Sequence, residues 1–300
     1  MKVIKIVKKI SSANLITHAG RFHADDIFAT AFLSKIIKNP KVCRVNDFTK
    51  DIKTKAIVYD IGGGKFDHHQ VGAEFRKNGK DKYSSIGLLW REFGLDYIKK
   101  ITTLDAEIIF NKMDESLMYQ IDAIDNGNFP VIESDYRLKT LSDVIGMFNP
   151  TWDNQEIMNK RFIQAVNFAE IIFDLEIEKI ISKLKAKEEV LEKISKTTDN
   201  ILLLDKFMPF KDFVLDSNEN IKFVIFPSQR DGYTVHTVPI SKEDRNPRVE
   251  LIKEWGGLRN KELQEISNIK TAIFVHPDLF IGGAMTLEDS IKMAKISMEK

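Results

Sequence analysis

The sequence carries, at residues 18–26, the stretch HAGRFHADD, in which two histidines and two aspartates stand close together. An apolar run that includes Leu15 and Ile16 precedes the stretch, and an apolar helix pattern begins at Ile27. This order predicts a strand, a short turn and a helix. The donor side chains then lie on the turn at the carboxyl end of the strand, where open α/β sheets place their sites.

A second cluster of donors follows another apolar run, at residues 56–59. Asp60 ends that run, and Asp67, His68 and His69 come soon after it. Four of the six histidines therefore fall in two short turns that each follow an expected strand. Because strands that alternate with helices predict a parallel sheet, we expect an α/β protein.

The remaining patterns predict two domains joined by a long helix. We expect a metal-binding domain at 1–152 with a parallel sheet flanked by helices, a connector helix at 153–198 and a smaller α/β domain at 199–300. In the first domain the expected strands are 1–10, 14–17, 41–46 and 56–60, and the expected helices are 25–37, 84–94 and 104–125. In the second domain the expected strands are 201–204, 221–226, 233–238 and 272–276, and Gly282 and Gly283 are expected to open the final helix.

Composition limits the classes of function. The chain has 300 residues, a formal net charge of +1 and one cysteine, Cys43, which lies in an apolar run. The near-neutral charge excludes a global basic field, so a phosphate-bearing substrate has to be held by local patches or by metal. The lone cysteine excludes an internal disulfide and indicates a reducing compartment. Because we find neither a membrane-length apolar run nor a signal-peptide pattern, we expect a cytoplasmic protein without a membrane partner.

The two donor clusters predict a metal site. A capping role explains Asp25 and Asp26 in the first turn of a helix, but it does not explain two histidines beside Asp67. Several carboxylates in one pocket also repel one another unless cations neutralise them. The donors available are His18, His23, His68, His69, Asp25, Asp60 and Asp67, with Asp122 or Asp125 from the end of the helix at 104–125. Carboxylates at a helix C-terminus oppose the helix dipole, a cost that a cation offsets.

The mixture of imidazole and carboxylate donors, without thiolate, suits manganese, with magnesium, cobalt, iron and zinc as alternatives. The number of histidines argues against magnesium alone. Two divalent ions bridged by an aspartate are suited to in-line attack at phosphorus. Donors for the phosphate oxygens are available from Ser84 and Ser85 at an expected helix N-terminus and from Arg259, beside Gly256 and Gly257.

Nine short motifs follow one another along the chain. They are HAGRFHADD at 18–26, DIGG at 60–63, DHHQ at 67–70, SSIG at 84–87, IDAIDNG at 121–127, NPTW at 149–152, GGLR at 256–259, FVH at 274–276 and FIGG at 280–283. In this order they resemble the melanocyte-proliferating-gene (MYG) family of the DHH phosphoesterase superfamily, metal-dependent hydrolases regarded as 3′→5′ RNA exonucleases. The DHH triplet alone is a weak signal, whereas the ordered set is specific.

The resemblance implies a first domain with a five-stranded parallel sheet that binds two metals, and a second domain that closes over the cleft and grips substrate. It implies metal ligation by His18, His23, Asp25, Asp60, His68 and Asp125 (or Asp122), with Asp60 bridging. It gives His69, with Asp67, a catalytic role toward the phosphate. The substrate contacts that we expect are Ser84, Ser85, Gly256, Gly257, Arg259, Gly282 and Gly283. The segment between Asp60 and Asp67 is shorter than in many members, and the targeting extension of eukaryotic members is absent.

We therefore expect a divalent-metal-dependent phosphodiesterase, a 3′→5′ exonuclease on RNA or short oligonucleotides that activates water with two metals. One alternative is a phosphoanhydride hydrolase acting on pyrophosphate or polyphosphate, and another is a metal-bound binding protein without turnover. The aromatic side chains that we considered for base stacking are Phe22, Phe66 and Trp255. The choice between RNA and DNA, and assembly into a homo-oligomer, stay open at this point.

Overall fold

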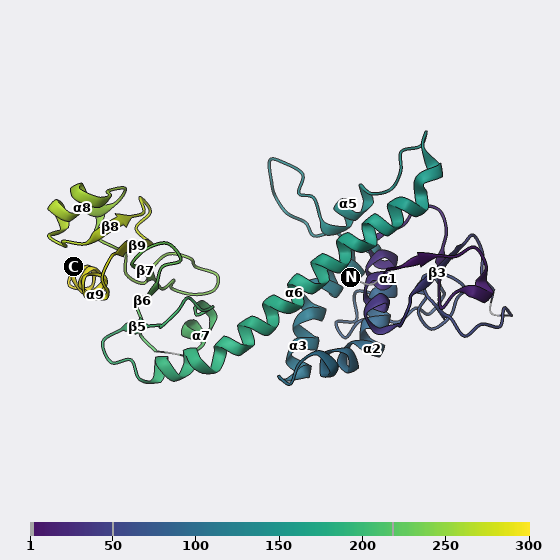
Figure 1. The fold of residues 1–300 in the computed structure, drawn as a ribbon, viewed down its shortest axis with the longest axis horizontal. Coiled ribbons are helices and arrows are strands. Elements are labelled where there is room, and N and C mark those ends of the chain that lie inside the picture. Colours follow the sequence, from purple (N-terminus) through teal and green to yellow (C-terminus); the bar gives the residue numbers. More distant parts are fainter. Residues whose placement is uncertain (1–2, 50, 218) are drawn as a thin grey trace. The chain divides into compact units, whose positions relative to one another are not determined.

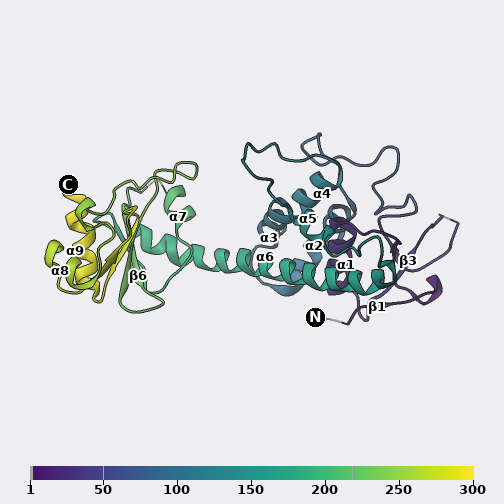
Figure 2. The same ribbon diagram turned by 90° about the horizontal axis from the view of Figure 1, so that it is seen from above.

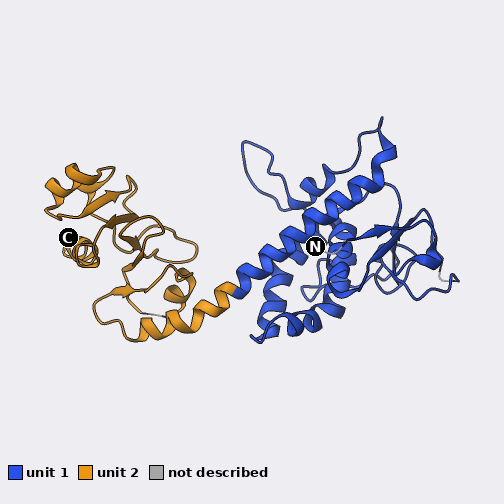
Figure 3. Ribbon diagram, in the orientation of Figure 1, with its two compact units in different colours: residues 1–181 blue, residues 182–300 orange. Residues whose placement is uncertain are grey.

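The computed structural model describes residues 3–49, 51–217 and 219–300. The chain divides into two compact units, residues 1–181 and residues 182–300 (Figure 3). The longest helix, α6 (Met158–Ser195), begins in the first unit and ends in the second (Figure 1). Within the described residues, none of the helices has the length and apolar character that crossing a bilayer requires.

The first unit contains a parallel sheet, as the alternation of strands and helices predicts. Its strands are β1 (Lys5–Ile6), β2 (Leu15–His18), β3 (Lys41–Val45) and β4 (Ile57–Val58), and their spatial order is β1-β3-β2-β4. The described part of this sheet has four strands, so the five-stranded sheet implied by the family resemblance is wrong for this chain. Strand β4 is short. Beyond it, Tyr59 still donates its N–H to the Ile16 carbonyl oxygen at 3.0 Å, and Asp60 then takes a left-handed φ of 57° that turns the backbone away.

The centre of this unit is helix α1 (Ala24–Ile36), which is apolar on nearly all sides and buried along most of its length. Its Phe32 ring lies 5.2 Å from the ring of Trp90 on α2 (Ser85–Ile101) and 5.8 Å from the ring of Phe173 on α6. The other face of the sheet packs on a smaller cluster that includes Ile16 and Cys43. Cys43 is buried, which agrees with its place in an apolar run.

Two helix predictions in this unit need comment. The helix expected to end at Gly94 continues to Ile101, because this glycine serves packing: a Cβ there would come within 2.6 Å of the Trp90 ring. The helix expected at 104–125 is present as α3 (Ala106–Met113), a π-helical turn η2 (Asp114–Met118) and α4 (Tyr119–Asp125). The shorter helices are η1 (Ile10–Ser12), α5 (Leu141–Gly146) and η3 (Gln155–Ile157).

The second unit is built on a mixed sheet with helices on both faces (Figure 2). Its strands are β5 (Ile201–Leu203), β6 (Phe223–Pro227), β7 (Tyr233–Thr237), β8 (Ala272–Val275) and β9 (Ile281–Ala284), in the order β5-β6-β7-β9-β8. Its helices are α7 (Lys211–Asp216), η4 (Lys253–Trp255), α8 (Asn260–Ser267) and α9 (Leu287–Met298). Side chains along β6 alternate between two cores: Phe223 and Ile225 pack toward α8 and α9, whereas Val224 and Phe226 pack toward α7 and α6.

The prediction that Gly282 and Gly283 open the final helix is wrong. Both lie inside strand β9, and α9 begins only at Leu287. A Cβ at Gly283 would come within 2.7 Å of the Tyr233 carbonyl oxygen, and one at Gly282 within 2.9 Å of the Phe274 carbonyl oxygen. The two glycines therefore let β9 lie close to both neighbouring strands.

Candidate metal centre

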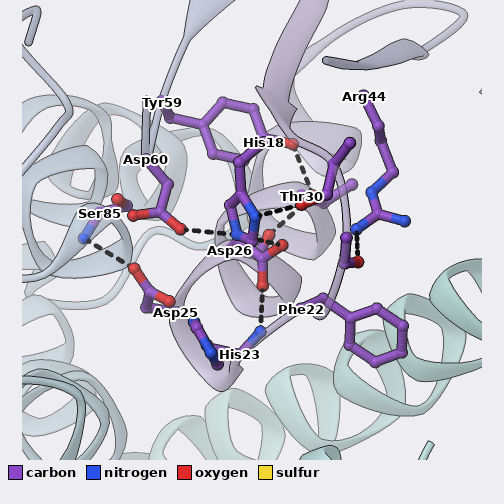
Figure 4. A network of polar contacts seen from close by, with 12 residues as sticks. His18, Phe22, His23, Asp25, Asp26, Thr30, Arg44, Tyr59, Asp60 and Ser85 are labelled. Carbon is purple, nitrogen blue, oxygen red and sulfur yellow. Dashed lines mark hydrogen bonds and ion pairs between the residues drawn. The ribbon is translucent and has the colours of Figure 1, made fainter. Parts of the chain in front are cut away.

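The first donor stretch joins β2 to α1, so its histidines and aspartates lie at the carboxyl end of the parallel sheet. His18 is the last residue of β2, and Asp60 follows β4. The Nε2 atom of His18 lies 3.2 Å from Oδ2 of Asp60 and 3.3 Å from Oδ2 of Asp26 (Figure 4). The topology expected from the sequence thus brings two distant segments to one point.

The protonation of His18 indicates which kind of ligand can bind between His18, Asp26 and Asp60. Its Nδ1 lies 2.8 Å from the carbonyl oxygen of Ala19, which only accepts, so Nδ1 carries a proton. In the neutral ring, Nε2 then presents a lone pair to the carboxylates of Asp26 and Asp60. His18 Nε2, Asp26 Oδ2 and both oxygens of Asp60 are buried without a hydrogen-bond partner among the described residues. A divalent cation satisfies such a convergence of lone pairs.

The second donor stretch completes the cluster from the other side of Asp60. His68 Nε2 lies 3.2 Å from Oδ1 of Asp60, 3.2 Å from Oδ2 of Asp125 and 3.5 Å from Oδ2 of Asp25. This nitrogen is also buried without a hydrogen-bond partner among the described residues. The structure therefore gathers donors from the start of α1, from the loop after β4 and from the end of α4.

Three sets of side chains within the described residues place their donor atoms within 4.8 Å of one another: His18, Asp26 and Asp60; Asp60, His68 and His69; and His23, Asp25 and Asp125. All six sequence-predicted ligands, with Asp125 as the helix-end carboxylate, lie in these sets. Asp60 belongs to two sets, so its two oxygens face two different groups of donors. Such mixed carboxylate and imidazole sets fit divalent cations.

Asp26 is the residue that the sequence reasoning missed, because it was assigned to helix capping. Its Oδ1 does accept a hydrogen bond from the backbone N–H of His23, at 2.8 Å. Its Oδ2 nevertheless faces His18. The signal available in the sequence was the second aspartate after His23, but its position is also that of a capping-box carboxylate. The side chain has both roles.

Asp122 lies outside the donor sets and has partners of its own. It is fully buried, and it pairs with the guanidinium of Arg76, which also contacts Asp114. The Asp122 carboxylate accepts hydrogen bonds from the backbone N–H and the hydroxyl of Ser84, at 3.0 and 2.6 Å. Burial raises the pKa of Asp122 to about 7, against the opposing effect of Arg76 and Ser84. This network ties the start of α2 to α4.

Ser84 and Ser85, expected to donate to phosphate, are both buried. The Ser84 hydroxyl is committed to Asp122, whereas the backbone N–H of Ser85 points at Oδ2 of Asp25, 3.4 Å away (Figure 4). The Ser85 hydroxyl has no hydrogen-bond partner among the described residues. In this structure the two serines therefore organise the carboxylates around the candidate centre.

The electrostatics of the cluster also favour cations. Burial raises the pKa of Asp25, Asp26 and Asp125, and mutual repulsion with neighbouring carboxylates adds to the effect for Asp25. Burial lowers the pKa of His18, but the carboxylates of Asp26 and Asp60, 3.3 and 3.2 Å from Nε2, outweigh it and raise the value to about 10. Without metal, the cluster is thus expected to hold extra protons, which divalent ions displace when they bind.

His69 differs from His68 in exposure and partner. Its side chain is 60% exposed, against 6% for His68, and its Nδ1 lies 3.0 Å from Oδ1 of Asp67. That hydrogen bond raises the pKa of His69. Burial opposes ionisation of Asp67, but hydrogen bonds from His69 and from the backbone N–H of Gly63 outweigh it and lower the pKa. The Asp67 carboxylate thus favours the protonated form of the His69 ring and fixes Nδ1 as the donor to it.

In an extended segment the adjacent side chains at 68 and 69 would point in opposite directions, but the two rings lie only 4.1 Å apart. Residues 67–70 form a loop rather than a strand, so the alternation of an extended chain does not apply. The division between a buried and an exposed histidine arises from the loop.

The other residues predicted to contact substrate lie in the second unit. Gly257 has a left-handed φ of 81°, and Gly256 packs against Leu279, where a Cβ would come within 2.9 Å. Arg259 is exposed at the start of α8, with its guanidinium 5.8 Å from the ring of Phe274. The three aromatic side chains considered for base stacking are buried in the cores: Phe22 is 0% exposed, Phe66 9% and Trp255 3%. They are core residues in this structure.

Comparisons with known proteins identify the family. A model of the family MYG1_exonuc, described as "Uncharacterised protein family (UPF0160)", matches residues 14–298. The MYG1 protein of Dictyostelium discoideum is 32% identical over 95% of this chain and 96% of its own length, and the MYG1 protein of Saccharomyces cerevisiae is 31% identical over 99% of each chain. The MYG1 exonuclease of Mus musculus is 29% identical over 94% of this chain and 84% of its own. The match spans both units and every motif of the candidate centre, and the chain therefore belongs to the MYG1 family, UPF0160.

Proposed function

We propose that this protein is a divalent-metal-dependent phosphodiesterase, a 3′→5′ exonuclease that acts on RNA or short oligonucleotides with two metal ions. The coarser part, a hydrolase acting on phosphodiesters, is supported by membership of a family with relatives named exonuclease. The direction, the RNA substrate and the two ions are the finer part of the proposal.

One observation carries the two-metal part. Asp60 is buried, with Oδ2 facing His18 and Oδ1 facing His68, and neither oxygen has a hydrogen-bond partner among the described residues. A carboxylate that only accepts hydrogen bonds is costly to bury in this state unless cations lie beside it. One ion would be held by His18, Asp26 and Asp60. A second would be held by Asp60, His68, Asp25 and Asp125, with His23 beside Asp25 and Asp125. Such ions would polarise a phosphoryl group and lower the pKa of bound water.

The remaining chemistry belongs to His69 and Asp67. The Asp67 carboxylate fixes the proton on Nδ1 of His69, so the exposed Nε2–H is free to donate to a phosphate oxygen. The same proton is available to the oxygen that leaves when the P–O bond breaks. The hydrogen bonds from the backbone N–H groups of Gly63 and His69 hold Asp67 in place, at 2.6 and 3.0 Å.

Manganese is the ion that we favour, because the donor sets mix imidazole with carboxylate and contain no thiolate. The test is a panel of pyrophosphate, a dinucleotide, and end-labelled RNA and DNA oligomers, each assayed with manganese, with magnesium and with chelator. We expect manganese-dependent shortening of RNA from its 3′ end. Turnover of pyrophosphate without nuclease activity would identify a phosphoanhydride hydrolase, and full nuclease activity under chelator would refute the metal assignment.

A further inference from the structure

A pocket of about 310 Å³ opens beside the candidate metal centre in the first unit. His23, His69 and Asp125 line it from the centre, and Arg21, Phe22 and Asn149 line it from the adjoining loops. The volume is at the small end of the range for ligand sites. Arg21 supplies the only lysine or arginine side chain among the described lining residues.

The backbone on both sides of Arg21 is held firmly. On one side, the Gly20 carbonyl oxygen accepts a hydrogen bond from Nη2 of Arg44 at 2.7 Å, and the Arg44 guanidinium lies 4.4 Å from the ring centre of Phe162 on α6. On the other side, the Asn149 amide bonds to both the N–H and the carbonyl of Phe22, at 3.0 and 2.9 Å. This contact gives the NPTW motif a structural role.

The side chain of Arg21, in contrast, is exposed and uncommitted. Across residues 3–49, 51–217 and 219–300, no carboxylate forms an ion pair with its guanidinium. Arg21 thus has a fixed backbone and, within the described residues, a guanidinium without a carboxylate partner, at the rim of a pocket. A cation in this position is placed to bind an anion rather than to stabilise the fold.

The charge of the candidate metal centre indicates what the Arg21 guanidinium can do there. Asp125 lines the pocket, and the other carboxylates of the adjoining centre are Asp25, Asp26, Asp60 and Asp67. Two divalent ions balance four of these charges, and the fifth, on Asp67, faces the His69 ring. A phosphodiester adds a negative charge, and charge at the phosphoryl group grows during in-line attack. A fixed guanidinium beside the metals stabilises that charge.

We propose that Arg21 binds a phosphate group of the nucleotide substrate in this pocket, and so acts as a substrate-binding residue next to the metals. The assignment rests on the proposed function, because it places a nucleotide phosphate beside the donor sets. A planar guanidinium forms two parallel hydrogen bonds to phosphate oxygens, which a lysine reproduces only in charge.

The test compares Arg21→Gln and Arg21→Lys in the full, manganese-loaded chain. The matched control is Arg161→Gln, an exposed arginine on α6 that is hydrogen-bonded to Gln164 and lies outside the pocket lining. Calorimetry gives the dissociation constant of inorganic phosphate, and kinetics give KM and kcat with a dinucleotide and with pyrophosphate. Metal content and melting temperature are measured for each variant.

We expect Arg21→Gln to raise the phosphate dissociation constant and the KM for the dinucleotide by about 10- to 100-fold. Metal content should match wild type, Arg21→Lys should recover part of the loss, and Arg161→Gln should behave as wild type. Unchanged phosphate binding, or loss of metal in Arg21→Gln, would overturn the assignment. A KM that rises for pyrophosphate alone would overturn the nucleotide as ligand. Because phosphate binding is measured without turnover, it decides the role of Arg21 even if the wild-type chain hydrolyses no phosphodiester.

Discussion

At the scale of single residues, the chemistry depends on which nitrogen of each histidine carries a proton. His18 keeps its proton on Nδ1 against a backbone carbonyl, and His69 keeps one on Nδ1 against a carboxylate. The first arrangement frees a lone pair for a cation, whereas the second favours a protonated ring, which suits an anion. His18 and His69 thus have different roles because their hydrogen-bond partners differ.

The contrast between the two adjacent histidines gives the first prediction. His68→Ala removes a buried nitrogen that faces Asp60 and Asp125, so metal content and activity should fall together. His69→Ala should keep the metal and lower turnover by about 10²- to 10³-fold, as for a lost oxyanion donor. Both variants are to be loaded at equal manganese concentration and measured by elemental analysis. Equal loss of metal would show that the division of roles is wrong.

The Asp67–His69 pair gives a prediction about pH. The carboxylate raises the pKa of His69, so the protonated form persists to higher pH, and activity that needs this proton is lost as pH rises through that pKa. Asp67→Asn removes the charge and lowers the pKa of His69. The alkaline limb of the kcat profile should therefore move to lower pH, and His69→Ala should lack that limb. A limb that stays in place in Asp67→Asn would assign it to another group.

The roles of single residues could be predicted from the sequence only where the spacing of the residues alone indicates them. The two donor turns could be assigned because histidines rarely gather beside aspartates without a ligand. Asp26 was missed because its position equally satisfies a capping rule, and only the fold shows that its second oxygen faces His18. The exposed state of His69 depends on the loop at 67–70, whose path no local pattern specifies.

At the scale of elements, a buried ion pair positions the helices that supply donors. Arg76 reaches from the loop before α2 to Asp114 in the π-helical turn and to Asp122 in α4. The π turn adds one residue to the helical path, which brings both carboxylates to one guanidinium. Asp125, one turn beyond Asp122, is thereby fixed toward His68.

This network predicts the effect of Arg76→Leu on stability. The change leaves Asp122 buried and unpaired, so the free energy of unfolding should fall by about 3–5 kcal/mol. Adding Asp122→Asn should restore part of it. The control is Arg91→Leu, which breaks an exposed pair with Glu74 and should cost less than about 1 kcal/mol. Denaturant titration measures all three, and equal losses for the buried and exposed pairs would contradict this account.

The same variant has a pH signature. The folded pKa of Asp122 is about 7, above its usual value of 3.8, so the folded chain holds this proton more tightly than the unfolded chain. Such a group contributes most to stability below pH 4, and the contribution is lost as pH rises toward 7. Without Arg76 the pKa rises further, so below pH 7 both folded chains keep this proton and the deficit of Arg76→Leu stays constant. The deficit should grow as pH rises above 7, where only the wild-type carboxyl ionises.

The elements themselves were largely predictable, and the errors share one cause. The parallel strands and α1 follow from apolar spacing. The local pattern predicts helix boundaries at Gly94 and at the Gly282–Gly283 pair, because glycine is common at the ends of helices. In the fold each makes room for a neighbour instead: Trp90 in one case and the adjoining strands of β9 in the other. A close approach between segments that are distant in sequence cannot be predicted from the local sequence pattern.

At the scale of the whole molecule, the candidate ligands and the second unit are separate in the chain. All three donor sets belong to residues 1–181, whereas Arg259 lies in residues 182–300. The sequence assigned Arg259 to substrate from the GGLR motif, and this stays a prediction. The separation makes it testable, because metal binding and substrate binding should respond to changes in different units.

Arg259→Ala should therefore leave the metal content unchanged and raise KM for an oligonucleotide by about 10- to 100-fold, if the exposed guanidinium binds a phosphate. Among the described residues, the interaction of the Arg259 side chain is with the ring of Phe274, whose centre lies 5.8 Å from the guanidinium, so its loss should have little effect on the fold. Arg230→Ala, an exposed arginine near the β6–β7 turn of the same unit, is the matched control. Steady-state kinetics and elemental analysis on the same preparations make the comparison. An unchanged KM would remove Arg259 from the substrate site, and a fall in metal content would mean that the second unit is needed to assemble the centre.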